Sequence, residues 1–150
     1  MERIFLDYVL PCLWAFLACV GFTLVFNIHG VGKLICGFGG GLGWLVYLLA
    51  GSSIVAAFLA AVAIGVFSEI MARLRRCPVT GSLLVALLPL VPGGGIYYAM
   101  SYCVAGDTDR FLAELLHTFG MAAALAVGAM LASSVFRTVF PRLYHRPAGS

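Results

Sequence analysis

Two prolines and a run of three glycines interrupt a long apolar stretch in the second half of the chain: Pro89, Pro92 and Gly93 to Gly95. Proline has no backbone N–H, so a helix through these residues leaves the carbonyl oxygens of Val85 and Leu88 without their usual donors. A second helix that begins at about the last glycine would present free N–H groups and the positive end of its dipole at the break. Such an end attracts carboxylates, and freed carbonyl oxygens can hold a cation.

The break is expected at a depth where water is absent. A helix that begins at Val79 has climbed about 20 Å by Val91, which is past the middle of a hydrocarbon core about 30 Å thick. Broken backbone at that depth is tolerated only where protein covers it or where it lines a wet cavity. Discontinuous helices of this kind form substrate sites in many secondary transporters. A simple proline kink accounts for the prolines as well, so both interpretations stay open.

Two tyrosines and an asparagine extend the predicted site. Tyr98 and Tyr102 share one helix face just after the break, where they would face a substrate or belong to an interfacial aromatic belt. Asn27 ends the first apolar segment, and its simplest role is to satisfy backbone groups there. The predicted substrate site comprises Pro89, Pro92, Gly93, Gly94, Gly95, Tyr98, Tyr102 and Asn27.

Four ionisable residues, Asp7, Glu69, Glu114 and His117, are candidates for a proton relay. Asp7 is the acid expected to face a cavity near the outer end of the first segment. Glu69 lies one turn before Arg73, which favours an i,i+4 ion pair at the cytoplasmic interface over a proton carrier. Glu114 and His117 are spaced i,i+3 and are expected to lie wet at the surface, because a single ExxH motif does not make a metal site.

Other chemistry has no support in the sequence. No nucleophile–base pair, metal-ligand cluster or cofactor fingerprint is present, so we predict neither an enzyme nor a bound metal or cofactor. The five cysteines form no CxxC motif, and we predict no disulfide. The net charge of +3 comes from basic residues at the ends of apolar runs, not from a basic stripe, so nucleic-acid binding is not indicated.

The elements that position these residues must be membrane helices. Hydrophobic residues make up 63% of the chain and charged residues 10%, whereas a soluble domain has about 25% charged residues. Lipid cannot satisfy exposed backbone groups, and the apolar runs are too long for the alternating strands of a barrel. The sequence therefore predicts one all-α, polytopic membrane bundle over residues 1–150. Its five spans are expected at about 4–26, 34–50, 54–71, 79–105 and 111–140.

The placement of lysine and arginine predicts the orientation of the bundle. Seven of the nine basic residues fall on one side if there are five spans: Lys33, Arg73, Arg75, Arg76, Arg137, Arg142 and Arg146. That side is the cytoplasm, so the N-terminus is expected outside and the C-terminus inside. A four-span alternative with a re-entrant fourth segment would put the two arginine clusters on opposite sides.

Small residues recur every four positions on three of the predicted spans. The sets are Gly37 with Gly41, Gly39 with Gly43, Ala57 with Ala61 and Gly65, and Gly120 with Ala124 and Gly128. Such faces let helix backbones approach closely, so they predict tight helix packing within the bundle.

Three stretches together resemble a known family: GFTLVFN at 21–27, GFGGGLGWLVY at 37–47 and LLPLVPGGGIYYAM at 87–100. They are similar to the threonine/serine exporter (ThrE) family, most closely to its small second-half membrane module, the YjjB-type subunit. The resemblance spans nearly the whole chain. It implies a subunit of a bacterial inner-membrane exporter that moves threonine and serine, or succinate in the two-subunit type, with an ion gradient as the energy source.

The resemblance also implies a partner. A YjjB-type subunit works with a larger membrane subunit of the YjjP type, so we expect a hetero-oligomer in the bilayer, with a homo-oligomer as the alternative. The rival interpretation is a non-transporting scaffold subunit that stabilises a partner membrane protein.

Overall fold

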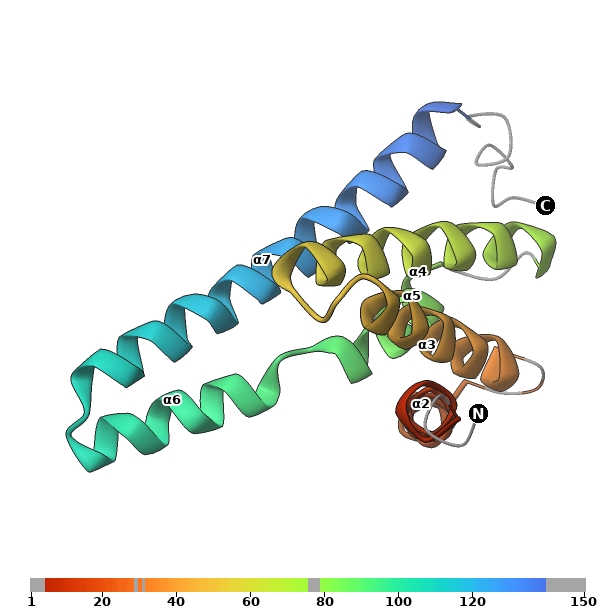
Figure 1. Ribbon diagram of the computed structural model, residues 1–150. Coiled ribbons are helices and arrows are strands. Elements are labelled where there is room, and N and C mark those ends of the chain that lie inside the picture. The colour runs from red at the N-terminus through yellow and green to blue at the C-terminus, as the bar shows by residue number, and fades with distance from the viewer. Residues whose placement is uncertain (1–4, 29, 31, 76–78, 140–150) are drawn as a thin grey trace.

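The computed structural model describes residues 5–28, 30, 32–75 and 79–139, and it confirms the all-α class. Its elements are the π-helical turn η1 (Phe5–Val9), α2 (Leu10–Val25), α3 (Gly32–Leu49), α4 (Ile54–Arg75), α5 (Val79–Leu87), the 3₁₀ turn η2 (Leu88–Leu90), α6 (Gly93–Ala105) and α7 (Thr108–Val139) (Figure 1). The predicted span ends Ile4 and Phe140 lie outside the described residues, as do Arg76, Arg142 and Arg146.

The helix lengths establish a multi-pass membrane protein. Three helices, α3, α4 and α7, are long and apolar enough to cross a bilayer, and the bent pair of α5–η2 and α6 adds a fourth if it counts as one span. The remaining helix, α2, is apolar but has only 16 residues. The fifth crossing therefore stays a prediction that depends on α2 and the π-helical turn before it.

Contacts between α4 and α7 show that these two helices run in the same direction. Ile54 lies against Gly120 near the start of the pair, and Ala61 lies against Gly128 further along. If the α5–α6 segment were re-entrant, α7 would begin on the side where α4 ends, and the pair would be antiparallel. The structure therefore opposes the four-span alternative, because α5–α6 carries the chain back across the bundle.

α3 is the central helix, and its glycines lie at contacts with neighbours on two faces. A Cβ on Gly37 would lie 2.7 Å from the Phe16 ring of α2, and one on Gly39 would lie 3.1 Å from the Cβ of Ala86 on α5. Gly43 leaves room for Ile64 of α4 in the same way. The predicted close packing at small residues is confirmed.

The core lies where α3, α4, α5 and α7 meet, and small side chains fill much of it. Its buried members are Ala57, Ala60, Ala61, Ile64, Ala86, Leu90, Met121 and Leu125. Large apolar side chains are instead abundant on the outside of the bundle, as expected where the solvent is lipid.

α6 and the first turns of α7 form a hairpin that reaches away from the other helices (Figure 1). We call residues Gly93–Phe119 the arm. Its turn is tightly made: Gly106 adopts a left-handed φ of 79°, and the Asp107 N–H donates to the Tyr102 carbonyl at 3.0 Å. The Asp107 carboxylate then accepts the N–H of Arg110 at 3.2 Å, which caps the start of α7.

The α4–α7 contact is tested by adding a methyl group at Gly128. A Cβ there would lie 2.8 Å from both the Ala61 Cβ and the Phe58 carbonyl oxygen. We expect Gly128→Ala to destabilise the protein by roughly 1–3 kcal/mol through overpacking, measured as a lower Tm in mild detergent. The matched control is Gly21→Ala on α2, where a Cβ meets nothing within 4 Å. Equal Tm values for the two variants would contradict the close α4–α7 packing.

Candidate functional site

The predicted break is present, and its geometry is that of two helices joined at an angle. α5 ends at Leu87, the chain makes one 3₁₀ turn, and Val91 is extended with φ −63° and ψ 124°. Pro92 then precedes α6, which begins at Gly93 instead of Gly95. The two parts are bent by 45°. The prolines and glycines therefore produce a sharp change of direction between α5–η2 and α6.

Both carbonyl groups released by the prolines have found donors within the chain. The Cys19 thiol of α2 donates to the Val85 carbonyl, with 3.3 Å between Sγ and O. The Leu88 carbonyl accepts the N–H of Val91 at 3.2 Å. In this conformation neither oxygen is the open cation ligand that the sequence allowed.

The start of α6 differs, because no side chain caps it and its donors after Gly93 are open. The Gly93 N–H bonds back to the Val91 carbonyl at 2.8 Å, and no side chain caps this helix end. Gly93 and Gly94 are exposed, and a Cβ on either would meet nothing within 4 Å. The first-turn N–H groups of a helix have no intrahelical acceptor, so this end offers donors and a positive dipole to an anionic group.

Gly95 has a different role from its two neighbours. A Cβ there would overlap the Thr118 hydroxyl of α7. Thr118 is buried and donates to the Glu114 carbonyl at 2.7 Å. The third glycine thus lets α6 and α7 approach each other at the base of the arm, whereas the first two leave the break open.

A cleft of about 390 Å³ lies beside the break, between α2 and α3. It is lined by Leu10, Pro11, Trp14, Ala15, Ala18, Trp44 and Pro89. The indole N–H of Trp44 is buried and has no hydrogen-bond partner within the described ranges. A larger apolar groove of about 670 Å³ on η1, α2, α3 and α4 contains none of the predicted site residues.

The two predicted tyrosines lie on the arm, beyond the break. The exposed Tyr98 ring packs against Tyr97 with 5.6 Å between centroids. Tyr102 lies about 14 Å further along α6 than Gly93, and the Arg110 guanidinium is 6.0 Å from its ring centroid. The tyrosines therefore lie on the helix that follows the break, and Tyr102 lies beside Arg110 at the tip of the arm.

Asn27 is not brought to the break. It follows α2 in a left-handed conformation with φ 55°, which asparagine tolerates better than most residues. The next residue, Ile28, lies beside Gly81 near the start of α5, while Pro89 follows the other end of α5. The geometry agrees with a backbone role for Asn27 at this turn.

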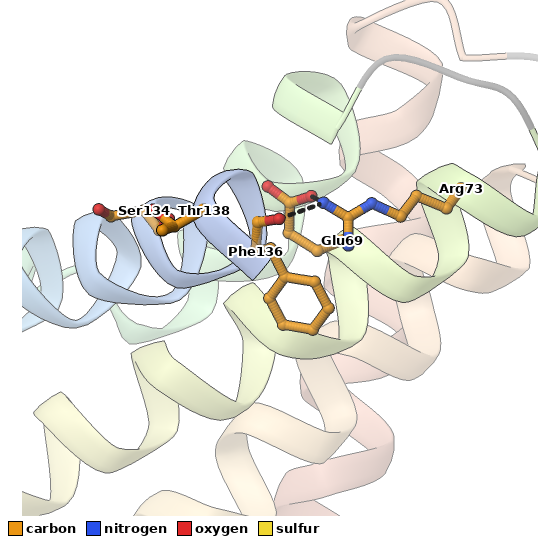
Figure 2. A network of polar contacts seen from close by, with 5 residues as sticks. All are labelled: Glu69, Arg73, Ser134, Phe136 and Thr138. Atoms are coloured by element: carbon orange, nitrogen blue, oxygen red, sulfur yellow. Dashed lines mark hydrogen bonds and ion pairs between the residues drawn. The ribbon is translucent and has the colours of Figure 1, made fainter. Parts of the chain in front are cut away.

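Glu69 and Arg73 form the predicted ion pair, with 3.2 Å between Oε2 and a guanidinium nitrogen. The same guanidinium donates to the Phe136 carbonyl at 3.1 Å and lies 4.7 Å from the Phe136 ring centroid. Figure 2 shows this group between the two acceptors. Because Glu69 is buried, its charge needs such a partner. The network joins the end of α4 to the last turns of α7, near the Thr138–Ser134 hydrogen bond of 3.0 Å.

The four relay candidates do not form a chain. Glu114 and the exposed His117 lie on the arm, whereas Glu69 packs near the far end of α7, about 30 Å away along that helix. Asp7 lies in the π-helical turn, and its side chain is outside the described set. No group of three or more metal-binding side chains gathers among the described residues.

Sequence reasoning missed the tertiary partners of the break, namely Cys19, Trp44 and Thr118. The proline rule identified Val85 as an acceptor in need of a donor. Its donor comes from a helix 66 residues earlier, and no local pattern indicates that pairing.

Discontinuous helices are a feature of many membrane transport proteins, and the bent pair of α5–η2 and α6 has that form. The protein-family profile described as "Threonine/Serine exporter, ThrE" matches residues 11–135 of the chain. The chain therefore belongs to the ThrE family, which is a family of transporters and not of enzymes. No curated protein and no solved structure matches the chain.

The different roles of the three glycines lead to a test of folding. Gly95→Ala should loosen the arm, because the added methyl group overlaps Thr118, and overpacking of this kind costs roughly 1–3 kcal/mol. Gly94→Ala, the matched control one residue away, should leave Tm unchanged. Limited proteolysis within the arm should be faster in Gly95→Ala only. If Gly94→Ala destabilised the protein equally, the assignment of Gly95 to helix packing would be wrong.

Proposed function

We propose that the chain is a subunit of a bacterial secondary exporter of small carboxylate metabolites, such as threonine, serine or succinate. The observation that carries the proposal is the open, uncapped start of α6 at a break within one span of a ThrE-family protein. Substrate would bind at Gly93 and Gly94, beside the cleft that contains Pro89. Tyr98 would lie on the path outward from the break.

The chemistry of the break supports a carboxylate more than any other group. A helix N-terminus carries the equivalent of roughly half a positive charge and a set of free N–H donors. Glycine brings no Cβ between the donors after Gly93 and a ligand, and a Cβ on Gly93 or Gly94 would meet nothing within 4 Å. Threonine, serine and succinate all carry a carboxylate, so this feature supports the class and not one member of it.

An ion gradient is the energy source that fits the sequence. The chain has no GxxxxGK[ST] loop for ATP. Membrane transporters without such a loop commonly couple export to the entry of an ion. Among the relay candidates, Glu69 is held by Arg73. Glu114 and His117 lie on the arm beside Thr118, the residue that contacts Gly95.

A larger YjjP-type membrane subunit would complete the pathway. Broken backbone within a bilayer must be covered by protein or line water, yet Val91, Gly93 and Gly94 are exposed in the single chain. Five crossings would also put the two termini on opposite sides. A partner half with an odd number of spans would then lie in the inverted orientation that alternating-access transporters use.

The alternative is a scaffold subunit that transports nothing. The packing of Gly95 against Thr118 supports this alternative for part of the motif, because it gives one motif glycine a packing role within the chain. The two functions differ at Gly94, where an added Cβ would meet nothing within 4 Å.

An export assay tests the proposal and separates it from the scaffold function. Cells that contain this chain and its YjjP-type partner should release labelled threonine, serine or succinate faster than cells that lack either chain. Gly94→Ala should slow release about tenfold through lost donor contacts to a charged group, with the amount of assembled protein unchanged. Gly21→Ala, an exposed helical glycine away from the break, is the control.

Two results of this assay would count against the proposal. Equal release of all three solutes with and without the chain would reject the substrate class. Loss of assembled protein in Gly94→Ala, together with loss of release, would favour the scaffold.

We also propose that the N-terminus is outside and the C-terminus is in the cytoplasm of the bacterial inner membrane. Contacts make α3 antiparallel to α4 and α4 parallel to α7, so Lys33, Arg73 and Arg137 share one end of the bundle. The positive-inside rule assigns that end to the cytoplasm. In a cysteine-free background, a membrane-impermeant maleimide should label Asp107→Cys in intact cells and Ala148→Cys only after lysis. Labelling of both in intact cells would overturn this orientation.

A further inference from the structure

The Val85 carbonyl group needs a hydrogen-bond donor from another part of the chain. Its usual donor would be the N–H of residue 89, which is a proline. Val85 is 0% exposed, so water cannot replace the missing donor. A buried carbonyl group without a partner is costly, and more so within a bilayer.

The donor is the Cys19 thiol, and the surrounding residues are arranged for it. Cys19 is also 0% exposed, and its Sγ lies 3.3 Å from the Val85 oxygen. A Cβ on Gly40 of α3 would overlap this sulfur atom, so the glycine leaves the space that the thiol occupies. Three helices thus meet at one hydrogen bond.

This bond links α2 directly to the broken span. The other released carbonyl, that of Leu88, is satisfied from within the segment by Val91. The Cys19–Val85 bond is a direct hydrogen bond between α2 and the last turn of α5. Val85 lies one turn before Pro89, so its carbonyl group fixes the last turn of α5 and hence the direction in which α6 leaves it.

We propose that Cys19 is a positioning residue for the break: its thiol holds the last turn of α5 in the orientation that points the start of α6 at its ligand. Cys19 does not touch the ligand and acts through the Val85 carbonyl group. The link to export rests on the function proposed above, whereas the effect on the local structure does not.

Cys36 supplies a matched control within the same cluster. It is 1% exposed and packs beside Cys19 and Val85. The hydrogen bond to the Val85 oxygen is made by Cys19 alone of the two. Cys36→Ala and Cys19→Ala therefore each remove one buried sulfur atom from the same cluster. Only Cys19→Ala also removes the donor to the Val85 carbonyl. Cys19→Ser retains a donor of similar size.

Amide hydrogen exchange of the full chain in mild detergent tests the proposal without reference to transport. In peptides that cover 88–95, Cys19→Ala should exchange at least about fivefold faster than the wild type, because a buried acceptor loses its only donor. Cys19→Ser and Cys36→Ala should stay within roughly twofold of the wild type, because neither leaves that acceptor unpaired. Equal rates in Cys19→Ala and Cys36→Ala would overturn the proposal.

Export kinetics supply the second readout, normalised to the amount of assembled protein. Cys19→Ala should raise KM for the exported solute at least about fivefold, since the ligand donors lose their alignment, and Cys19→Ser should restore it. A purely structural role would lower the amount of assembled protein and leave KM unchanged, which would also overturn the proposal. Absence of export in the wild type would reject the proposed function, while the exchange rates would still decide the role of Cys19.

Discussion

The fold depends on one constraint: lipid supplies neither hydrogen-bond partners nor a hydrophobic force that drives helices together. Helices in this solvent associate through close contact, and here the contact is organised by α3. Gly37 opens one face of α3 to α2, while Gly39 and Gly43 open another face to α5 and α4. Bulky side chains on those faces would separate three neighbours at once. The alanine-rich core and the apolar exterior follow from the same rule.

The broken span shows how the same constraint shapes chemistry. Two prolines remove two donors, and the chain responds by satisfying the acceptors that they leave, through Cys19 at Val85 and through Val91 at Leu88. It does not cap the donors at the start of α6. The break therefore has satisfied acceptors on one side and open donors on the other. The sequence allowed a carboxylate at the start of α6 or a cation at the freed carbonyl oxygens. Open donors beside satisfied acceptors favour the carboxylate.

What the sequence predicted correctly has a local or compositional cause. The apolar content implied membrane helices, the prolines implied a break, and an i,i+4 spacing implied the Glu69–Arg73 pair. The rest depends on where helices cross. The contact of Gly95 with Thr118 joins residues of two helices that sequence spacing alone does not align. The hydrogen bond from Arg73 to the Phe136 carbonyl spans 63 residues for the same reason. Asn27 is in a stretch that resembles the family, but it does not join the predicted site. The next residue, Ile28, lies beside Gly81 at the start of α5, whereas Pro89 follows the other end of that helix.

The unbroken length of α7 has a mechanical consequence. The helix has 32 residues, about 48 Å, and packs along α4 from Gly120, beside Ile54, to Phe136, beside Arg73. One end carries the arm, and Arg73 holds the other through Phe136. A rod that is held along one part of its length and free along the rest is a cantilever, and the free part here carries the arm. Sideways movement of the arm would therefore load the first α4–α7 contact, between Ile54 and Gly120, before it reached the turns that Arg73 holds at Phe136.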